Sequence, residues 1–318
     1  MHAYTTTAQQ SYGMVNQPVI DLRITPLAYD PILGPDIELS EKMLGTYYEI
    51  FKQVLPPENR DPHLDSQLLY GETVKIVTEG KWLEVEAIEQ EHFNNTKQRF
   101  EPIKGFVKNN QITRITTIPE CNIAVSTLHT HIQTNNGIIT LPMGTLLSGK
   151  PYTNNQYEVS LTDGRHGFIT TDVCTFLENI TEEKMRNQIV SCANKLVGKS
   201  YKWGGRGPDS IDCSGLINLS YRTCGIIIPR NAHCIYKKFK HINGNDLQPG
   251  DVIFFAKKDT FHVIHILLYC GDGKIIQSST SKGSVIKQND IDLLGKSISD
   301  IKSGDIFANY ILFFGTLF

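Results

Sequence analysis

The sequence predicts a multidomain protein in which two small β-barrels precede an α+β domain. Up to about residue 180, short alternating segments are separated by Gly, Asn and Asp turns, which is typical of small barrels. Beyond that point, two helical patterns come before a series of strand patterns, which is the order of an α+β domain. We therefore expect domains at residues 1–118, 119–180 and 181–318.

The first segment mixes strand patterns with one helical pattern. Residues 18–26 alternate like a strand, and residues 39–55 carry apolar side chains at helical spacing behind Ser40. The run "LLYGETVKIVTEGKWLEVEAI", residues 68–88, predicts two strands that turn at "EGK". This segment is expected to be a barrel with a helical insertion.

The second segment predicts another barrel of similar organisation. The runs "GIITLPMGTLLSGK", "NQYEVSLTDG" and "RHGFITTDV" read as short strands between turns. Both segments show a strand, then "YGE" or "PMG", a strand, a turn, a strand, and "KGFV" or "HGFI". This order indicates a weak internal repeat.

The third segment begins with two helical patterns. The run "TEEKMRNQIVSCANKLVGKSY" starts with Thr181 as a cap and ends at Gly198. The run "DCSGLINLSYRTCG" predicts a second helix with Gly225 after its last turn. The strand patterns "GDVIFFA", "HVIHILLYCGDGKIIQSS" and "YILFFG" follow.

Composition excludes several classes of protein. The net charge of −2 argues against a general nucleic-acid binder, and the longest apolar runs are far shorter than the ~20 residues of a membrane helix. The first residues lack the pattern of a signal peptide. Seven scattered cysteines in such a chain favour reduced thiols over a disulfide framework. We therefore expect a soluble, cytoplasmic protein.

Cys213 is the candidate nucleophile. It lies between an acid and a serine in "DCSG", three residues before the apolar helical pattern, and so at or near a helix N-terminus. That position favours a thiolate, and its N–H groups could hold an oxyanion. Gly215 leaves room for a substrate backbone to approach. From position alone, a small buried cysteine is the commoner interpretation.

A histidine base and a group that orients its ring can both come from one hairpin. In "FHVIHILLYCGDGKIIQSS", a three-residue loop at "GDG" places Leu267 opposite Gln277. His265 then shares a face with Gln277, whose amide oxygen can accept the ring N–H, as in a papain-like triad. His262 falls on the opposite face. His265 is therefore the predicted base, although a lone strand histidine is often structural.

The other cysteines have structural interpretations, and no metal is expected. Cys192 and Cys224 lie on inner helix faces, and the chain has no C-x-x-C pair of the kind that binds zinc. The sequence therefore predicts no metal site and no cofactor.

The third segment resembles the NlpC-type cell-wall cysteine peptidases, a papain-like family. Five motifs, which cover residues 181–318, occur in the same order: "YKWGG", "DCSGLI", "YRTCGIIIPR", "LQPGDVIFF" and "HILLYCGDGKIIQSS". The resemblance implies that Cys213 is the nucleophile, His265 the base and Gln277 the third polar residue. The family most often has His at that third position. Gln277 can still orient the ring of His265, but unlike a histidine it does not titrate.

The two upstream segments resemble bacterial Src-homology-3-type (SH3-like) barrels, and the whole order resembles the muropeptide-trimming members of the family. Those relatives cleave the γ-D-glutamyl bond to the diamino acid and require a free N-terminal L-alanine. The resemblance implies that Asp212 and Ser214 hold the amine and that Tyr201 lies beside the nucleophile. It also implies that Glu72 of "LLYGE" closes the site with an aromatic residue. The nearest match to that residue is Phe106, where the family typically has Tyr.

These binding residues also have structural alternatives. Asp212 could be a plain helix N-cap, Glu72 a solvated turn acid, and Tyr201 a neighbour that packs on Trp203. The binding interpretation is coherent because two carboxylates, Asp212 and Glu72, suit an ammonium group. A barrel wall at one end of the cleft would exclude longer, glycan-linked stems.

The combined prediction is a cysteine peptidase that hydrolyses the γ-D-glutamyl–diamino acid bond of peptidoglycan stem peptides, L-Ala-γ-D-Glu-diamino acid, in wall turnover or recycling. Cys213 attacks, His265 takes and returns the proton, and water releases the acyl-enzyme. Two rivals remain: a wall-binding module that has lost activity, and an acyltransferase that uses the same Cys/His pair. We expect a cytoplasmic monomer that binds no nucleic acid and no membrane, with the periplasm or cell surface as the alternative location.

Overall fold

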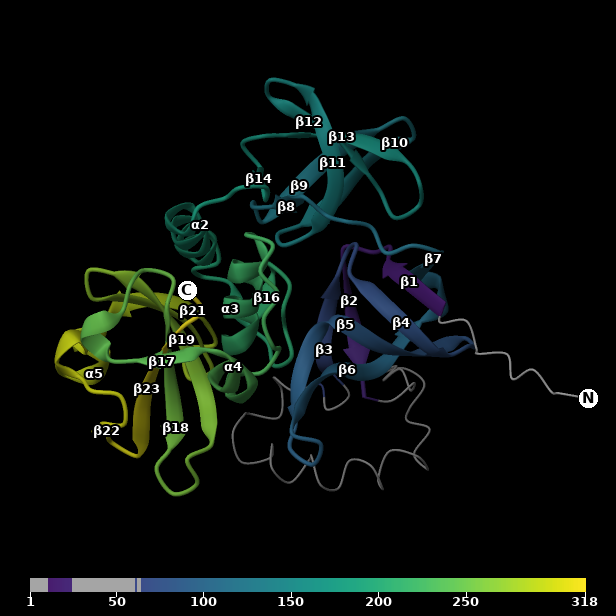
Figure 1. Ribbon diagram of the computed structural model, residues 1–318. Helices are drawn as coiled ribbons and strands as arrows, with labels where there is room; N and C mark the ends of the chain where they lie inside the picture. The colour runs from purple at the N-terminus through teal and green to yellow at the C-terminus, as the bar shows by residue number, and fades with distance from the viewer. Residues whose placement is uncertain (1–10, 25–60, 62–63) are drawn as a thin grey trace, which may run out of the picture.

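The computed structural model describes residues 11–24, 61 and 64–318 and arranges them around three β-sheets (Figure 1). Two seven-stranded sheets come first along the chain, and a nine-stranded sheet with the described α-helices follows. The protein is therefore multidomain and mostly β. The helix predicted at residues 39–55 lies outside the described residues.

The first sheet has the strand order β3-β2-β6-β5-β4-β1-β7. Its strands are β1 Ser11–Val15, β2 Val19–Arg23, β3 Leu64–Leu69, β4 Thr73–Thr78, β5 Trp82–Asn94, β6 Arg99–Lys108 and β7 Ile112–Ile115. β4 and β5 pair antiparallel, and their alternating apolar side chains, such as Val74 and Val85, lie in one core. The alternation predicted for residues 68–88 is confirmed, and β2 is the strand predicted within residues 18–26.

The second sheet has the order β10-β9-β13-β12-β11-β8-β14, which is the order of the first sheet with each strand number raised by seven. Its strands are β8 Ile123–Val125, β9 His129–Thr134, β10 Gly137–Pro142, β11 Leu146–Thr153, β12 Gln156–Ser160, β13 His166–Thr170 and β14 Cys174–Phe176. The internal repeat predicted from short motifs is therefore present in the strand order.

The third sheet has the order β16-β15-β21-β20-β19-β18-β23-β17, with β22 paired to β23. Its strands are β15 Ser200–Tyr201, β16 Ser210–Ile211, β17 Lys240–Ile242, β18 Val252–Lys257, β19 Val263–Gly271, β20 Lys274–Ser279, β21 Ser284–Asn289, β22 Ile306–Phe307 and β23 Tyr310–Thr316. The helices are α2 Glu182–Lys195, α3 Cys213–Arg222, α4 Ala232–Lys238 and α5 Asp290–Leu294.

Alternation along the third sheet separates two cores. Phe254 and Ile266 lie in the core shared with α2, α3 and α4, whereas Phe255 and Leu267 lie in the core on the opposite face, with α5. Both α2 and α3 begin at the predicted caps. Thr181 accepts the N–H of Lys184 at 3.4 Å, and Asp212 accepts the N–H of Gly215 at 2.6 Å.

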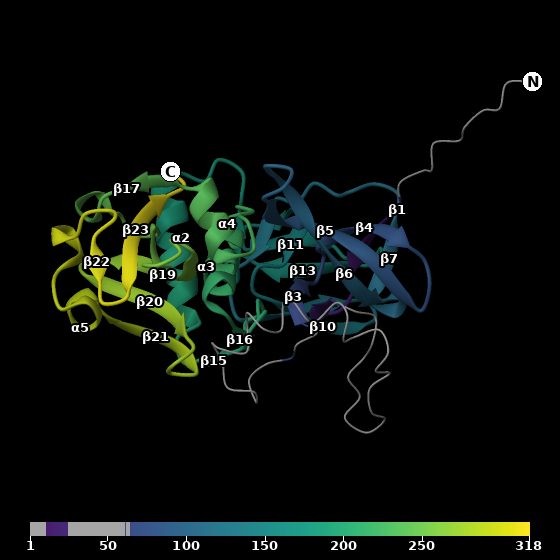
Figure 2. The same ribbon diagram turned by 90° about the horizontal axis from the view of Figure 1, so that it is seen from below.

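Helices α3 and α4 lie on the side of the third sheet that faces the first two sheets, as both views show (Figures 1 and 2). Residues of the first sheet thereby reach the ends of α3. No helix within the described part of the chain has the length and apolarity needed to cross a membrane.

Candidate active site

Cys213 is the first residue of α3 and is partly exposed. Asp212 caps the helix in extended conformation and turns the chain so that the cysteine follows directly. The predicted place of Cys213 at a helix N-terminus is therefore confirmed.

Gly215 does not provide the open approach that the sequence suggested. Its α-carbon faces the carbonyl oxygen of Gly205, and a side chain at residue 215 would collide with that oxygen. The same oxygen accepts the N–H of Asp212 at 3.1 Å. Because residue 215 has no side chain, the loop of residues 202–211 can pass over the start of α3. The expectation that Gly215 leaves space for a substrate backbone is therefore wrong, since this loop fills the space.

His265 and Gln277 lie on neighbouring strands and contact each other as predicted. A ring nitrogen of His265, Nε2, is 2.7 Å from Oε1 of Gln277. Leu268 pairs with Ile276, which is the register inferred from the sequence. Because an amide oxygen can only accept, this contact places the proton on Nε2 and leaves Nδ1 of His265 with a free lone pair.

The loop of this hairpin differs from the prediction. Gly271 pairs with Lys274, so the loop has two residues, and the ladder shifts by one between Tyr269 and Gly271. This bulge compensates for the shorter loop, which is why the register farther along the strands is nevertheless the predicted one.

His262 lies just before β19 and contacts a different partner. The ladder with β18 shifts between the Phe255–His265 pair and the Ala256–Val263 pair, so simple alternation does not hold there. The ring of His262 packs against that of His233 on α4, with centroids 5.2 Å apart. The expectation that His262 lies on the opposite face assumed a regular strand, and the bulge interrupts that strand.

The sulfur of Cys213 lies against the strand that carries His265. A backbone hydrogen bond connects it with Ile266, the residue after His265. Burial raises the pKa of the Cys213 thiol to about 12, and the negative charge of Asp212 adds to the rise. Burial and Asp212 therefore oppose the thiolate that the helix N-terminus favours.

The surroundings of His265 favour its neutral form. Burial lowers the pKa of His265 below its ordinary value, although the bond to Gln277 and the charge of Asp212 oppose that change. For a protonated thiol and a neutral imidazole, attack by the sulfur requires that the base take the proton as the new bond forms.

Tyr201 lies beside the nucleophile, as the resemblance implied. It is buried on β15, and burial raises its pKa, with the charges of Cys213 and Asp212 adding to the rise. Its hydroxyl interacts with Thr280. The phenol is thus neutral and forms part of the wall around the sulfur.

Asp212 is already saturated with donors. Its two oxygens bind Arg230 Nη2 at 2.7 Å and Nη1 at 3.1 Å, and they also accept from Gly215 and Gly204. Ser214 donates its hydroxyl to Asp212 at 3.2 Å and accepts from Arg230 at 3.0 Å. Asp212 and Ser214 therefore form a buried ion-pair cluster with an arginine to which the sequence assigned no role.

Glu72 is buried and already paired. Its side chain is 1% exposed, and Oε1 binds Arg206 while Oε2 accepts from Gln90 at 3.0 Å. Burial alone would raise the pKa of Glu72, but Arg206 and Arg222 lower it below its ordinary value. The turn acid is thus a buried structural anion, and its oxygens are not free for a substrate amine.

Phe106 lies on the first sheet. It is on β6, where it pairs with Arg23 of β2 and Glu84 of β5. No contact described for Phe106 connects it with Cys213 or Asp212.

Asp65 is a further acidic residue near the Asp212 cluster, and no sequence motif pointed to it. It lies on β3, and the charges of Arg230 and His92 act on it while burial raises its pKa. It therefore lies on the first sheet where that sheet faces the Asp212 cluster. The sequence contained a signal in "LDSQLL", because three consecutive polar residues interrupt the alternation expected of a half-buried strand.

The remaining cysteines and acids form no metal site in the described part of the chain. All seven cysteines are free thiols. No group of three or more His, Cys, Asp or Glu side chains among the described residues could hold a metal ion.

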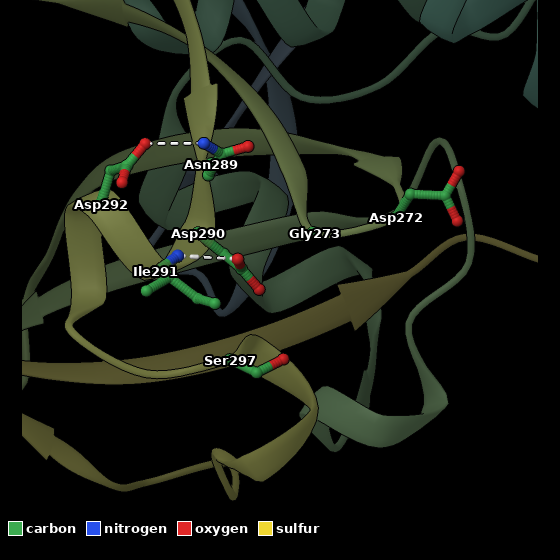
Figure 3. A pocket seen from close by; sticks show the side chains of 7 residues that line it. All are labelled: Asp272, Gly273, Asn289, Asp290, Ile291, Asp292 and Ser297. Atoms are coloured by element: carbon green, nitrogen blue, oxygen red, sulfur yellow. Dashed lines mark hydrogen bonds between the residues drawn. The ribbon is translucent and has the colours of Figure 1, made fainter.

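A separate acidic depression of about 400 Å³ lies at the other end of the third sheet (Figure 3). Asp290 accepts the N–H groups of Ile291 and Ile298 at 2.7 and 2.8 Å, and Asp292 accepts from Asn289 at 2.7 Å. These carboxylates stabilise the turns around α5, and no residue predicted for the catalytic site lines the depression.

A thiol at the start of a helix, packed against a strand whose histidine is held by an amide, is the arrangement of a papain-like cysteine peptidase. Residues 198–305 match the NlpC/P60 family, and this part of the chain is an NlpC/P60 domain. Members of this family are cysteine peptidases.

Curated relatives match about a third of the chain. It is 39% identical over 101 residues to the gamma-DL-glutamyl hydrolase of Bacillus subtilis, which is 31% of this chain and 24% of that protein. It is 34% identical over 90 residues to the probable endopeptidase p60 of Listeria seeligeri, which is 28% of this chain and 17% of that protein. The chain thus matches less than a quarter of the length of either relative.

Solved structures extend the similarity of fold to nearly the whole chain. The crystal structure of an NlpC/P60 family protein from Bacillus cereus superposes with a TM-score of 0.70 at 21% identity and covers 95% of this chain and 98% of that one. An NlpC/P60 endopeptidase from Photobacterium damselae gives 0.58 at 15% identity, over 96% of this chain and 72% of that one. At these identities the comparison concerns the fold alone.

Proposed function

We propose that this protein hydrolyses the γ-D-glutamyl–diamino acid bond of peptidoglycan stem peptides that have a free N-terminal L-alanine. The observation that carries the proposal is the 2.7 Å contact between His265 and Gln277, beside the thiol that begins α3. The relative named gamma-DL-glutamyl hydrolase supports a γ-glutamyl substrate.

The chemistry follows from the two neutral groups. Nδ1 of His265 takes the proton of the Cys213 thiol as the sulfur attacks the carbonyl carbon, and the N–H groups at the start of α3 hold the oxyanion. The imidazolium then protonates the leaving amine, and water hydrolyses the thioester. Gln277 keeps the ring oriented, since its oxygen accepts from Nε2 in both protonation states.

Selectivity for a free amine needs a carboxylate that is not already neutralised. Asp212 is paired with Arg230, and Glu72 is buried with Arg206, so neither offers an unpaired charge. Asp65 has no described hydrogen bond to its carboxylate and lies near the Arg230 cluster. We therefore assign the ammonium to Asp65, with Ser214 as a second polar contact.

We also propose a domain organisation, a location and an oligomeric state. The domains are residues 1–118, 119–180 and 181–318, the first two being SH3-like barrels whose bulk excludes longer stems. The protein acts as a cytoplasmic monomer in wall recycling and uses no cofactor. Phe106 on β6 is the aromatic residue proposed for the wall of the site.

The first test removes the sulfur. Cys213→Ala is expected to abolish release of the diamino acid from L-Ala-γ-D-Glu-diamino acid peptides, because no other group in the site can form the thioester. Cys270→Ala, at a partly exposed cysteine at the hairpin bulge, is the matched control and should retain full activity. Undiminished turnover by Cys213→Ala would disprove the mechanism.

The second test addresses the amine. Acetylation of the N-terminal alanine removes the charge that Asp65 is proposed to bind, so cleavage should fall to background. Equal cleavage of both peptides would disprove the free-amine requirement. Products joined to an added amine instead of water would show acyl transfer on the same Cys213–His265 pair.

A further inference from the structure

Three fully buried arginines connect the first sheet to the helix that begins with Cys213. Arg206, Arg222 and Arg230 are each at most 1% exposed and are the largest fully buried side chains among the described residues. All three lie in the loops that flank α3 or at its last turn, and each binds acceptors from the first sheet.

Two of these arginines hold the far part of α3. Arg222, the last residue of the helix, approaches Glu89 at 2.7 Å and Glu72 at 3.7 Å, and it donates to the carbonyl of Gly144 in the second sheet at 2.8 Å. Arg206 binds Glu72 and donates to Asn218 of α3 at 2.9 Å.

The third arginine acts on the near end of the helix. Arg230 donates to the hydroxyl of Ser66 on β3 at 2.7 Å and forms the ion pair with Asp212, the cap of α3. Cys213 follows that cap directly, so any movement of Arg230 is passed to the nucleophile through one peptide unit.

A continuous chain of buried hydrogen bonds joins these two clusters. Glu72 accepts from Gln90 at 3.0 Å, Gln90 accepts from Ser66 at 2.7 Å, and Ser66 accepts from Arg230 at 2.7 Å. Gln90 and Ser66 are fully buried, and leaving the polar group of either one without a hydrogen bond costs roughly 1–3 kcal/mol. This cost favours the single arrangement in which every hydrogen bond of the series is formed.

We propose that Ser66, Gln90 and Glu72 of the first sheet are positioning residues for the reaction at Cys213. They orient Arg230, which binds the cap of α3, and Arg206, which binds Asn218 in the middle of the helix. Residues 198–305 therefore form a competent site only when the first sheet is docked against them. This inference takes Cys213 as the reactive thiol and otherwise does not depend on the substrate proposed above.

The test uses the full chain and two readouts. Ser66→Ala removes one hydroxyl from the chain of bonds, and kcat/KM is expected to fall at least about fivefold at temperatures where the variant is folded. Arg230 lowers the pKa of Cys213, so a displaced guanidinium should raise that pKa and slow alkylation of Cys213 by iodoacetamide from neutral to mildly alkaline pH. The alkylation profile needs no substrate.

Matched variants separate positioning from general destabilisation. Ser66→Thr retains a hydroxyl and should restore both readouts, whereas Gln90→Met keeps the side-chain length and should impair them as Ser66→Ala does. Thr145→Val, at a buried hydroxyl of the second sheet with no hydrogen-bond partner, should leave both unchanged.

Folded Ser66→Ala with wild-type kcat/KM and a wild-type alkylation profile would overturn the inference. So would an equal loss in Thr145→Val, because the effect would then not be specific to the bonded chain. If the wild-type protein hydrolyses none of the peptides, the proposed function fails, and the alkylation profiles still decide whether the first sheet positions Cys213.

Discussion

The two seven-stranded sheets share one strand order and one turn, yet they contribute different chemistry. In each sheet a glycine with φ of +81° follows the third strand, Gly71 in the first and Gly144 in the second. The N–H of Gly71 donates to Val15 and that of Gly144 donates to Val125, both at 2.9 Å. The backbone of the repeat is therefore preserved around this turn.

The side chains at equivalent positions differ in charge. The residue after the glycine is Glu72 in the first sheet and Thr145 in the second, and both are buried. Six positions before the glycine, Asp65 faces the catalytic segment, whereas Ile138 is 65% exposed. The same strand order thus supports two kinds of contact. The first sheet places carboxylates next to α3, whereas the second sheet accepts a hydrogen bond from Arg222 with a backbone carbonyl.

The largest expected difference is in the free energy of unfolding, when the residues that follow the two glycines are substituted. Glu72→Ala leaves Arg206 and Arg222 buried with one carboxylate fewer, which should lower the free energy of unfolding by about 3–5 kcal/mol. Thr145→Val removes a hydroxyl without a hydrogen-bond partner and should change it by less than about 1 kcal/mol. Thermal and urea unfolding of both variants measure the contrast, and equal losses would contradict it.

The next difference is expected in substrate recognition. Asp65→Asn removes the proposed partner of the ammonium and should lower kcat/KM for the free-amine peptide about 10- to 100-fold, mainly through KM. Ile138→Asn is the equivalent change in the second sheet and should have no effect. Unchanged kinetics in Asp65→Asn would remove this residue from the site.

The pH dependence of activity also distinguishes the two sheets. Only the first sheet carries the carboxylate, Asp65, that we propose binds the substrate amine. Activity should fall as pH drops below the ordinary histidine range near 6.5, since His265 must be neutral to accept the proton and burial lowers its pKa. An alkaline decline near pH 8 should reflect loss of the substrate's ammonium proton. In Asp65→Asn the alkaline decline should weaken, which kcat/KM measured across pH would show.

The smallest effect is expected from the ion pair of the second sheet. His129 contacts Asp209 at 2.9 Å, and both side chains are well exposed, at 40% and 69%. Exposed pairs contribute about 0–1 kcal/mol, so His129→Ala should leave stability and kcat/KM nearly unchanged. A loss comparable to that of Glu72→Ala would show that the second sheet also carries an essential charge.

Local patterns were sufficient to predict the core of the site. The cap at Asp212 and the apolar spacing behind it locate the start of α3 from sequence alone. Strand alternation places His265 and Gln277 on one face, and their contact confirms it. The turn between those strands was less predictable, since Gly271, Asp272 and Gly273 all adopt positive φ and therefore permit loops of different length.

The environment of each group could not be predicted from such patterns. Glu72 and Arg206 are 134 residues apart, and their pairing depends on how the first sheet docks on α3. The pKa of Cys213 depends on that same docking, because burial is its largest cause. Spacing within one element shows which residues share a face, but it contains no information on what another domain brings to that face.

The distance in sequence between Glu72 and Arg206 also affects how the protein is made. Synthesis proceeds from the N-terminus, so Glu72 is added to the chain 134 residues before Arg206, whose guanidinium neutralises it. Until then the carboxylate must remain in water, and the sheet cannot close its surface around it. We therefore expect the first sheet to complete its folding late, when it packs against α3, so that a nascent chain shorter than about 206 residues cannot bury Glu72.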